Sequence, residues 1–190
     1  MKKICVFCGS SRGNNPVYVN AANEFGQYLV SQKIDLVYGG SHIGIMGILA
    51  DTVLENGGRV YGVITRQLQS KEIAHTGITK LHVVETMHER KAMMENLSDG
   101  FVALPGGVGT LDEIVEIFTW SQLSIHRKPF GFLNINNYFN RLHEFFRHMM
   151  TEGFLNEKYF HKLIISNNPA KLIETLKSYN HEPVSKWPDK

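Results

Sequence analysis

The chain has 190 residues, a mass of 21.6 kDa and a net charge of +2, from 20 basic and 18 acidic side chains. This length is typical of one globular domain, and so small a charge gives no reason to expect a nucleic acid or an anionic membrane as partner. The sequence has no apolar run near the roughly 20 residues that a membrane-spanning helix needs. The first apolar run, residues 4–7, is too short for a signal peptide, so we expect a cytoplasmic protein.

Short apolar runs alternate with helical patterns, which is typical of a parallel sheet with helices on both faces. In chain order, we expect strands at 4–7, 35–38, 59–64, 81–84, 101–104, 129–133 and 162–166. We expect helices at 16–31, after a glycine loop up to 55, and then at 87–97, 110–123, 138–151 and 169–179, with an irregular stretch before residue 81. The predicted fold is a single-domain, Rossmann-like α/β fold over residues 1–180, followed by a polar tail at 181–190.

The two cysteines, Cys5 and Cys8, form a Cys-x-x-Cys pattern at the end of the first strand. A zinc site would need two further ligands at suitable spacing, and a thioredoxin-type pair should begin a helix. A redox or metal pair is the alternative, but we expect two reduced thiols buried at a strand end. The nine histidines show no metal-ligand spacing, and we expect a surface or capping role for those near the strand ends, including His126.

Three glycine-containing loops follow predicted strands, at residues 8–11, 38–47 and 105–110. Because the carboxyl ends of parallel strands lie at one edge of the sheet, where ligands bind, the three loops predict a nucleotide-sized site. Neither a dinucleotide fingerprint nor a Gly-Lys-Ser/Thr phosphate loop is present. In the third loop, glycine backbone N–H groups at a helix start would hold a phosphate.

Two acids follow the third loop on the same helix. Glu113 and Glu116 are three residues apart, hence on one face, and acids near a helix start also complement the helix dipole. A bare phosphate pocket has no use for Glu113, whereas a carboxylate beside a sugar can position water or stabilise an oxocarbenium-like transition state. A basic pair, Arg90 and Lys91, follows the fourth strand; a solvated face is the alternative, but we expect the pair to contact a ligand anion. The joint pattern predicts an enzyme site.

These motifs resemble the LONELY GUY family, cytokinin riboside 5′-monophosphate phosphoribohydrolases that are often mislabelled lysine decarboxylases. The likeness is carried by residues 105–113 with Glu116 and by residues 87–91, and it extends over most of the chain. It implies a Rossmann-like homodimer with no metal or organic cofactor. It also implies hydrolysis of the N-glycosidic bond of an adenine-type nucleoside monophosphate, giving free base and ribose 5-phosphate.

By position, the resemblance implies that Arg90 and Glu113 are the catalytic pair. The substrate-binding residues that it implies are Glu72, Lys91, Gly106, Gly107, Val108, Gly109, Thr110, Glu116 and Thr119. The chain departs from the family at Ser41, which is usually glycine, and at Thr65, which is usually proline; both bear on pocket shape and base preference rather than reaction type. Lysine decarboxylation would need a Schiff-base lysine with further partners for pyridoxal phosphate, and the sequence does not supply them. The alternative from another class is a non-catalytic nucleotide or cofactor carrier that binds phosphate through the same loops.

Overall fold

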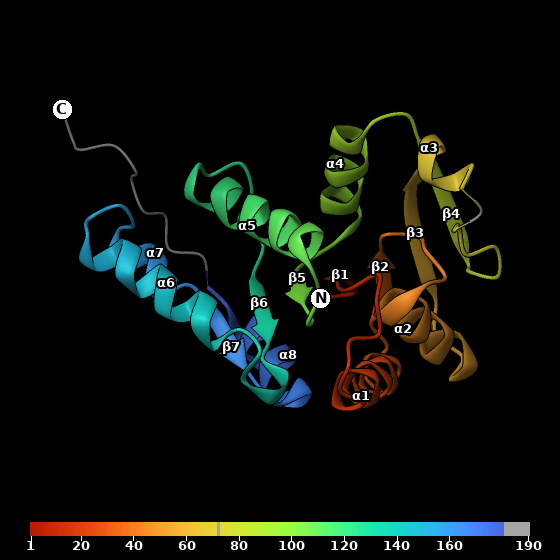
Figure 1. The fold of residues 1–190 in the computed structure, drawn as a ribbon, viewed down its shortest axis with the longest axis horizontal. Helices are drawn as coiled ribbons and strands as arrows, with labels where there is room; N and C mark the ends of the chain where they lie inside the picture. The colour runs from red at the N-terminus through yellow and green to blue at the C-terminus, as the bar shows by residue number, and fades with distance from the viewer. Residues whose placement is uncertain (72, 181–190) are drawn as a thin grey trace.

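The computed structural model describes residues 1–71 and 73–180, which form one seven-stranded parallel sheet with helices on both faces (Figure 1). The strands lie in the order β4-β3-β2-β1-β5-β6-β7. Their bounds are β1 Lys3–Phe7, β2 Asp35–Tyr38, β3 Val60–Thr65, β4 Lys80–Val84, β5 Phe101–Ala103, β6 Phe130–Leu133 and β7 Ile164–Ser166. The predicted α/β class with a parallel sheet is confirmed.

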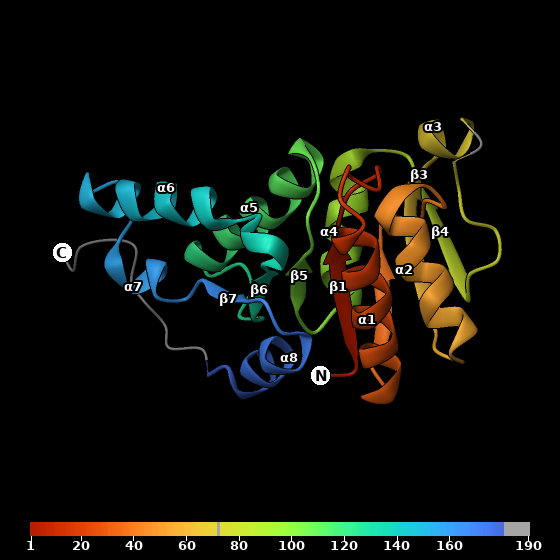
Figure 2. The same ribbon diagram turned by 60° about the horizontal axis from the view of Figure 1, so that its bottom comes forward.

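The helices form two layers, one on each face of the sheet (Figures 1 and 2). One layer contains α1 (Val17–Ser31), α2 (Gly44–Glu55) and α8 (Pro169–Ser178), whose apolar faces join one core cluster. The opposite layer contains α4 (Met87–Leu97), α5 (Val108–Gln122), α6 (Asn140–Thr151) and the short α7 (Glu157–Phe160), which share a second cluster rich in phenylalanine. Two short elements complete the described fold: α3 (Arg66–Gln69) after β3 and the 3-10 turn η1 (Ile135–Asn137) after β6.

The central strand β1 marks the point where the chain reverses direction across the sheet. From β1 the chain adds β2, β3 and β4 on one side, and it then returns to add β5, β6 and β7 on the other. The connections leaving β1 and β5 therefore diverge, and a crevice opens beyond the carboxyl ends of these strands, where doubly wound folds bind ligands. Buried strands such as Asp35–Tyr38 are covered on both faces, which explains their continuous apolar runs.

One difference from the expected elements lies between β6 and α6. We expected one helix from 138 to 151, whereas the structure has η1 followed by a helix that begins only at Asn140. Asn136 and Asn137 have φ values of 50° and 58°, in the left-handed region that ends regular helix. The Asn134 side chain accepts a hydrogen bond from Phe139 N at 2.7 Å, which stabilises this turn. The polar tail predicted for residues 181–190 lies outside the described residues.

Both cysteines are buried free thiols, as expected from the sequence. Burial raises the pKa of Cys5 and of Cys8, so neither is a reactive thiolate at neutral pH. Among the described residues there is no cluster of three or more side chains suited to a metal ion. Within the same residues, none of the helices combines the length and apolar character needed to cross a bilayer.

Candidate functional site

The three glycine loops meet at the crevice beside β1. Gly9 N donates to Pro105 O at 3.2 Å, and Ile45 N donates to Gly9 O at 3.0 Å, so backbone hydrogen bonds tie the loops to one another. They enclose a cavity of about 440 Å³, called the main cavity below, which also reaches α3, α4 and the first turns of α5. The loops therefore form one site.

The turn before α5 presents bare backbone to the main cavity. Gly106 has no room for a side chain, because a methyl group there would overlap Thr110 Oγ1 and approach Gly9 N to 2.7 Å. A methyl group on Gly107 or Gly109 would meet nothing within 4 Å, so the backbone there is open. The first amides of a helix lack partners within the helix and carry partial positive charge. The start of α5 is therefore suited to a phosphate-sized anion.

Arg90 and Glu113 form a buried ion pair in the wall of the main cavity. Arg90 Nη1 donates to Glu113 Oε1 at 2.8 Å, and Arg90 Nε donates to Val63 O, near the end of β3, at 2.9 Å. The two side chains are only 8% and 12% exposed. Buried charges persist only when they are paired, so this pair is held in a fixed geometry beside the anion-binding turn.

The chain places Arg90 by capping α4 firmly. The Thr86 side chain accepts from Glu89 N, and the Glu89 carboxylate accepts from Thr86 N, which together form a capping box. Arg90 lies one residue after Glu89, on the side of α4 that faces the ends of β2 and β3. The electrostatic setting of Glu113 is unusual: burial raises its pKa, although neighbouring Arg90 and Lys91 oppose this rise.

Lys91 forms a second ionic contact between α4 and α5. Its Nζ lies 2.8 Å from Asp112 Oδ2 and 3.1 Å from Glu116 Oε2. Burial alone would lower the pKa of Lys91, but the hydrogen bonds to the two acids raise it above its ordinary value. The basic pair of the sequence therefore has carboxylate partners within the protein, both for Arg90 and for Lys91.

The structure brings most of the predicted site residues together, with some exceptions. Thr119 is exposed, its hydroxyl donates to Val115 O, and it does not line the main cavity. Lys91 and Glu116 pair with each other and neither lines the main cavity, while Glu72 lies outside the described residues. Gly106 lines an adjoining pocket. Those that line the main cavity are Arg90, Glu113, Gly107, Val108, Gly109 and Thr110.

The sequence did not reveal the apolar part of the main cavity's lining. Met46, Leu68, Ile73 and Met87 form this part, and their side chains contrast with the bare backbone of the glycine turn. Leu68 lies on α3, in the stretch expected to be irregular. The signal that could have located α3 is Thr65, whose side chain accepts from Leu68 N and caps this short helix.

Ser41, the other departure from the family pattern, is buried in the wall of the main cavity. Its Oγ accepts from Ile43 N at 3.3 Å, and its backbone forms a bridge with Ala74. His42 N also donates to Ile73 O at 3.0 Å, so backbone hydrogen bonds join the loop after β2 to residues 73 and 74, which precede β4. The serine thus serves the local backbone while it narrows the cavity.

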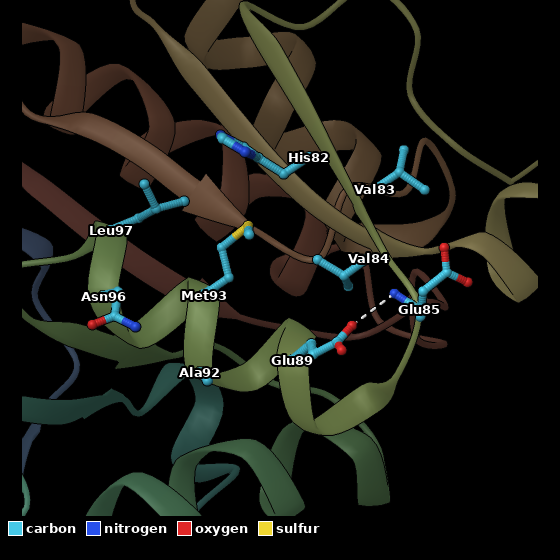
Figure 3. A pocket seen from close by; sticks show the side chains of 9 residues that line it. All are labelled: His82, Val83, Val84, Glu85, Glu89, Ala92, Met93, Asn96 and Leu97. Carbon is cyan, nitrogen blue, oxygen red and sulfur yellow. Dashed lines mark hydrogen bonds between the residues drawn. The ribbon is translucent and has the colours of Figure 1, made fainter.

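A separate groove lies between β4 and α4 (Figure 3). Val84 on the strand and Met93 and Leu97 on the helix give the groove an apolar floor. Glu89 lies at one end, where its carboxylate accepts a hydrogen bond from Glu85 N at 2.9 Å. Among the residues that the structure describes, the groove and the main cavity have no lining residue in common. It is therefore a surface distinct from the site that contains Arg90 and Glu113.

Similarity to known proteins is extensive. A family model described as "Possible lysine decarboxylase" matches residues 46–176. The chain is 44% identical to "Probable cytokinin riboside 5′-monophosphate phosphoribohydrolase LOGL2" of Oryza sativa subsp. japonica, over 98% of this chain and 78% of that protein. It is 45% identical to "Cytokinin riboside 5′-monophosphate phosphoribohydrolase LOG1" of Arabidopsis thaliana, over 97% of this chain and 87% of that protein.

Solved structures share the fold at lower identity. The molybdenum cofactor binding protein from Rippkaea orientalis has a TM-score of 0.69 at 20% identity, covering 94% of this chain and 97% of that chain. The molybdenum cofactor carrier protein of Chlamydomonas reinhardtii has a TM-score of 0.68 at 19% identity, covering 93% and 96%. At such identities the likeness concerns the fold alone.

Proposed function

Because the chain belongs to the LONELY GUY family of cytokinin riboside 5′-monophosphate phosphoribohydrolases, we propose that it hydrolyses the N-glycosidic bond of an adenine-type nucleoside 5′-monophosphate. The products are the free base and ribose 5-phosphate. The observation that carries the proposal is the buried Arg90–Glu113 pair, which shares the main cavity with the bare backbone at the start of α5.

The main cavity has a distinct place for each part of such a nucleotide. The open amides around Gly107 and Gly109 suit the 5′-phosphate. The apolar lining that includes Leu68 and Met87 suits the flat, weakly polar base. The ribose then lies between them, next to Glu113, which is where the bond to be cleaved must be.

Glu113 supplies the chemistry at the ribose. As the bond between C1′ and the base nitrogen breaks, its electron pair leaves with the base and positive charge develops on the sugar ring. The Glu113 carboxylate stabilises that charge and accepts a proton from the water whose oxygen attacks C1′. The departing base nitrogen takes up a proton from solvent, and Glu113 returns its own proton to solvent, so the free base leaves neutral and the carboxylate is regenerated. Arg90 fixes the orientation of this carboxylate and keeps it ionised in a buried setting.

The decarboxylase chemistry in the family description finds no support in the position of Lys91. A Schiff-base lysine must reach its cofactor with a neutral amine. Lys91 instead lies between Asp112 and Glu116, which hold its ammonium group and raise its pKa. Nucleotide hydrolysis does not need a neutral Lys91 amine, so the ion pairs of Lys91 are compatible with it.

The remaining parts of the proposal concern the protein's setting. We place the reaction in the cytoplasm, with the enzyme acting as a homodimer, as the family resemblance implies. Exposed apolar side chains such as Ile125 and Phe145 support a subunit contact on the side of the sheet that carries α4, α5 and α6.

The direct test is to assay purified protein for release of free base from AMP and from isopentenyladenosine 5′-monophosphate. Glu113→Gln keeps the shape of the side chain but removes its charge, so we expect kcat to fall by about 10²–10⁴-fold. Glu144→Gln, the same change at an exposed position on α6, is the matched control and should retain wild-type activity. If wild-type protein binds these nucleotides in calorimetry but releases no base, the carrier function replaces the hydrolase.

A further inference from the structure

Gly39, the residue that follows β2, touches the guanidinium of Arg90. A methyl group built on Gly39 would overlap Arg90 Nη2, and its next neighbour would be Met46 Sδ at 3.1 Å. We infer that Gly39 is a positioning residue for Arg90: its missing side chain forms the slot in which the guanidinium lies. The inference rests on the proposed function only where it concerns activity.

The slot has three walls, each from a different element. Val63 O, from β3, accepts from Nε, and Glu113, from α5, accepts from Nη1. Gly39, after β2, closes the third side by direct contact with Nη2. Because the guanidinium is planar and rigid, it cannot move away from Gly39 without losing alignment with Val63 O or with Glu113.

The glycine is required for space rather than for backbone conformation. Gly40, the next residue, has a φ of 77° and would be strained by any side chain. Gly39 is not among the residues with positive φ, so an alanine there can keep the same backbone. The substitution Gly39→Ala therefore keeps the backbone and mainly reduces the volume available to Arg90, with Met46 Sδ as the next neighbour at 3.1 Å.

Displacement of the guanidinium would act on Glu113. The carboxylate would lose the donor that orients it and the charge that opposes the rise of its pKa. Small displacements of a catalytic group can cost about 10²-fold in rate. We expect Gly39→Ala to lower kcat by about this factor, with a smaller effect on KM, since the amides at the start of α5 are untouched.

A double-mutant cycle separates this role from a general structural one. The variants are Gly39→Ala, Arg90→Ala and the two combined, with Gly77→Ala as control because a methyl group there meets its neighbours only at ordinary contact distances. The readouts are kcat, KM and the midpoint of thermal unfolding. In the Arg90→Ala background the added methyl group fills vacated space, so Gly39→Ala should then cost neither activity nor thermal stability.

If Gly39→Ala lowers the unfolding midpoint equally in both backgrounds, the glycine serves the loop itself and the inference is overturned. An unfolding midpoint and a kcat that match those of wild type in Gly39→Ala would overturn it as well. The unfolding midpoints can be measured whether or not the protein is catalytically active. A wild-type protein that releases no base would therefore end the proposed function and still leave the Gly39–Arg90 contact tested.

Discussion

At the scale of single residues, the buried Arg90–Glu113 pair determines how the site responds to pH. Burial raises the pKa of Glu113 and Arg90 opposes that rise, so the group titrates above the ordinary value for glutamate of about 4.3. The proposed chemistry needs the ionised carboxylate. Activity should therefore be present at high pH and be lost as the pH falls through the raised pKa.

This direction of the pH effect can be checked with the pH dependence of kcat/KM, which reports the pKa values of ionisable groups in the free enzyme. We expect the acid limb of wild type to lie above the usual glutamate range. Arg90→Gln removes the charge that opposes the rise, so the residual activity of this variant should show an acid limb shifted to higher pH. A shift to lower pH would contradict the assignment of that limb to Glu113.

The sequence predicted both members of this pair, but not that they contact each other. Glu113 was expected to serve a ligand and Arg90 to meet an anion, because local spacing identifies no partner for either side chain elsewhere in the chain. The two residues are 23 positions apart on different helices. Their contact depends on β5 lying beside β1, which puts α5 next to α4, and no pattern within either motif carries that information.

At the scale of elements, α4 matters because its first turn positions Arg90. The capping box of Thr86 and Glu89 provides partners for amides that the start of the helix would otherwise leave unpaired. We expect Thr86→Ala to lower the free energy of unfolding by about 1 kcal/mol. Urea unfolding measures this change, and Thr175→Ala, an exposed position on α8, should cost under about 0.5 kcal/mol. Equal losses in the two variants would mean that the capping box adds nothing.

The sequence located the long elements well and the short ones poorly. The 87–97 helix and the 35–38 strand were predicted with their observed bounds, since each combines a clear apolar pattern with a distinct start or end. The four-residue α3 has too few residues for a periodic pattern, and it is stabilised by its cap and its neighbours. Because Leu68 lies on α3 and lines the main cavity, the sequence also could not predict this apolar part of the lining.

At the scale of the whole molecule, His126 links pH to the stability of the core. We expected a surface or capping role, but the ring is buried and packs 5.5 Å from the Phe101 ring. Its Nδ1 accepts from Lys128 N at 3.1 Å, so in the neutral ring Nε2–H donates to Ile117 O at 2.9 Å. Only the neutral ring can form both hydrogen bonds. If Nδ1 were protonated, its N–H would point at the N–H of Lys128, and that hydrogen bond would be lost.

This arrangement fixes the sign of the pH effect. Burial lowers the pKa of His126, so below about pH 6.5 the unfolded chain binds a proton that the folded protein does not. The contribution of His126 to stability is therefore complete above the unfolded pKa and declines as the pH falls through it. Burial lowers the pKa of His82 and His143 in the same direction, although both are less buried.

We expect urea unfolding to show a lower free energy of unfolding at pH 5.5 than at pH 7.5. His126→Gln cannot bind the proton, so it should be less stable than wild type at pH 7.5 but lose less stability between the two values. His88→Gln, at an exposed position on α4, should keep the wild-type difference. If His126→Gln kept that difference as well, the pH dependence would have to come from other groups, and the neutral ring between Ile117 and Lys128 would not couple protonation to folding.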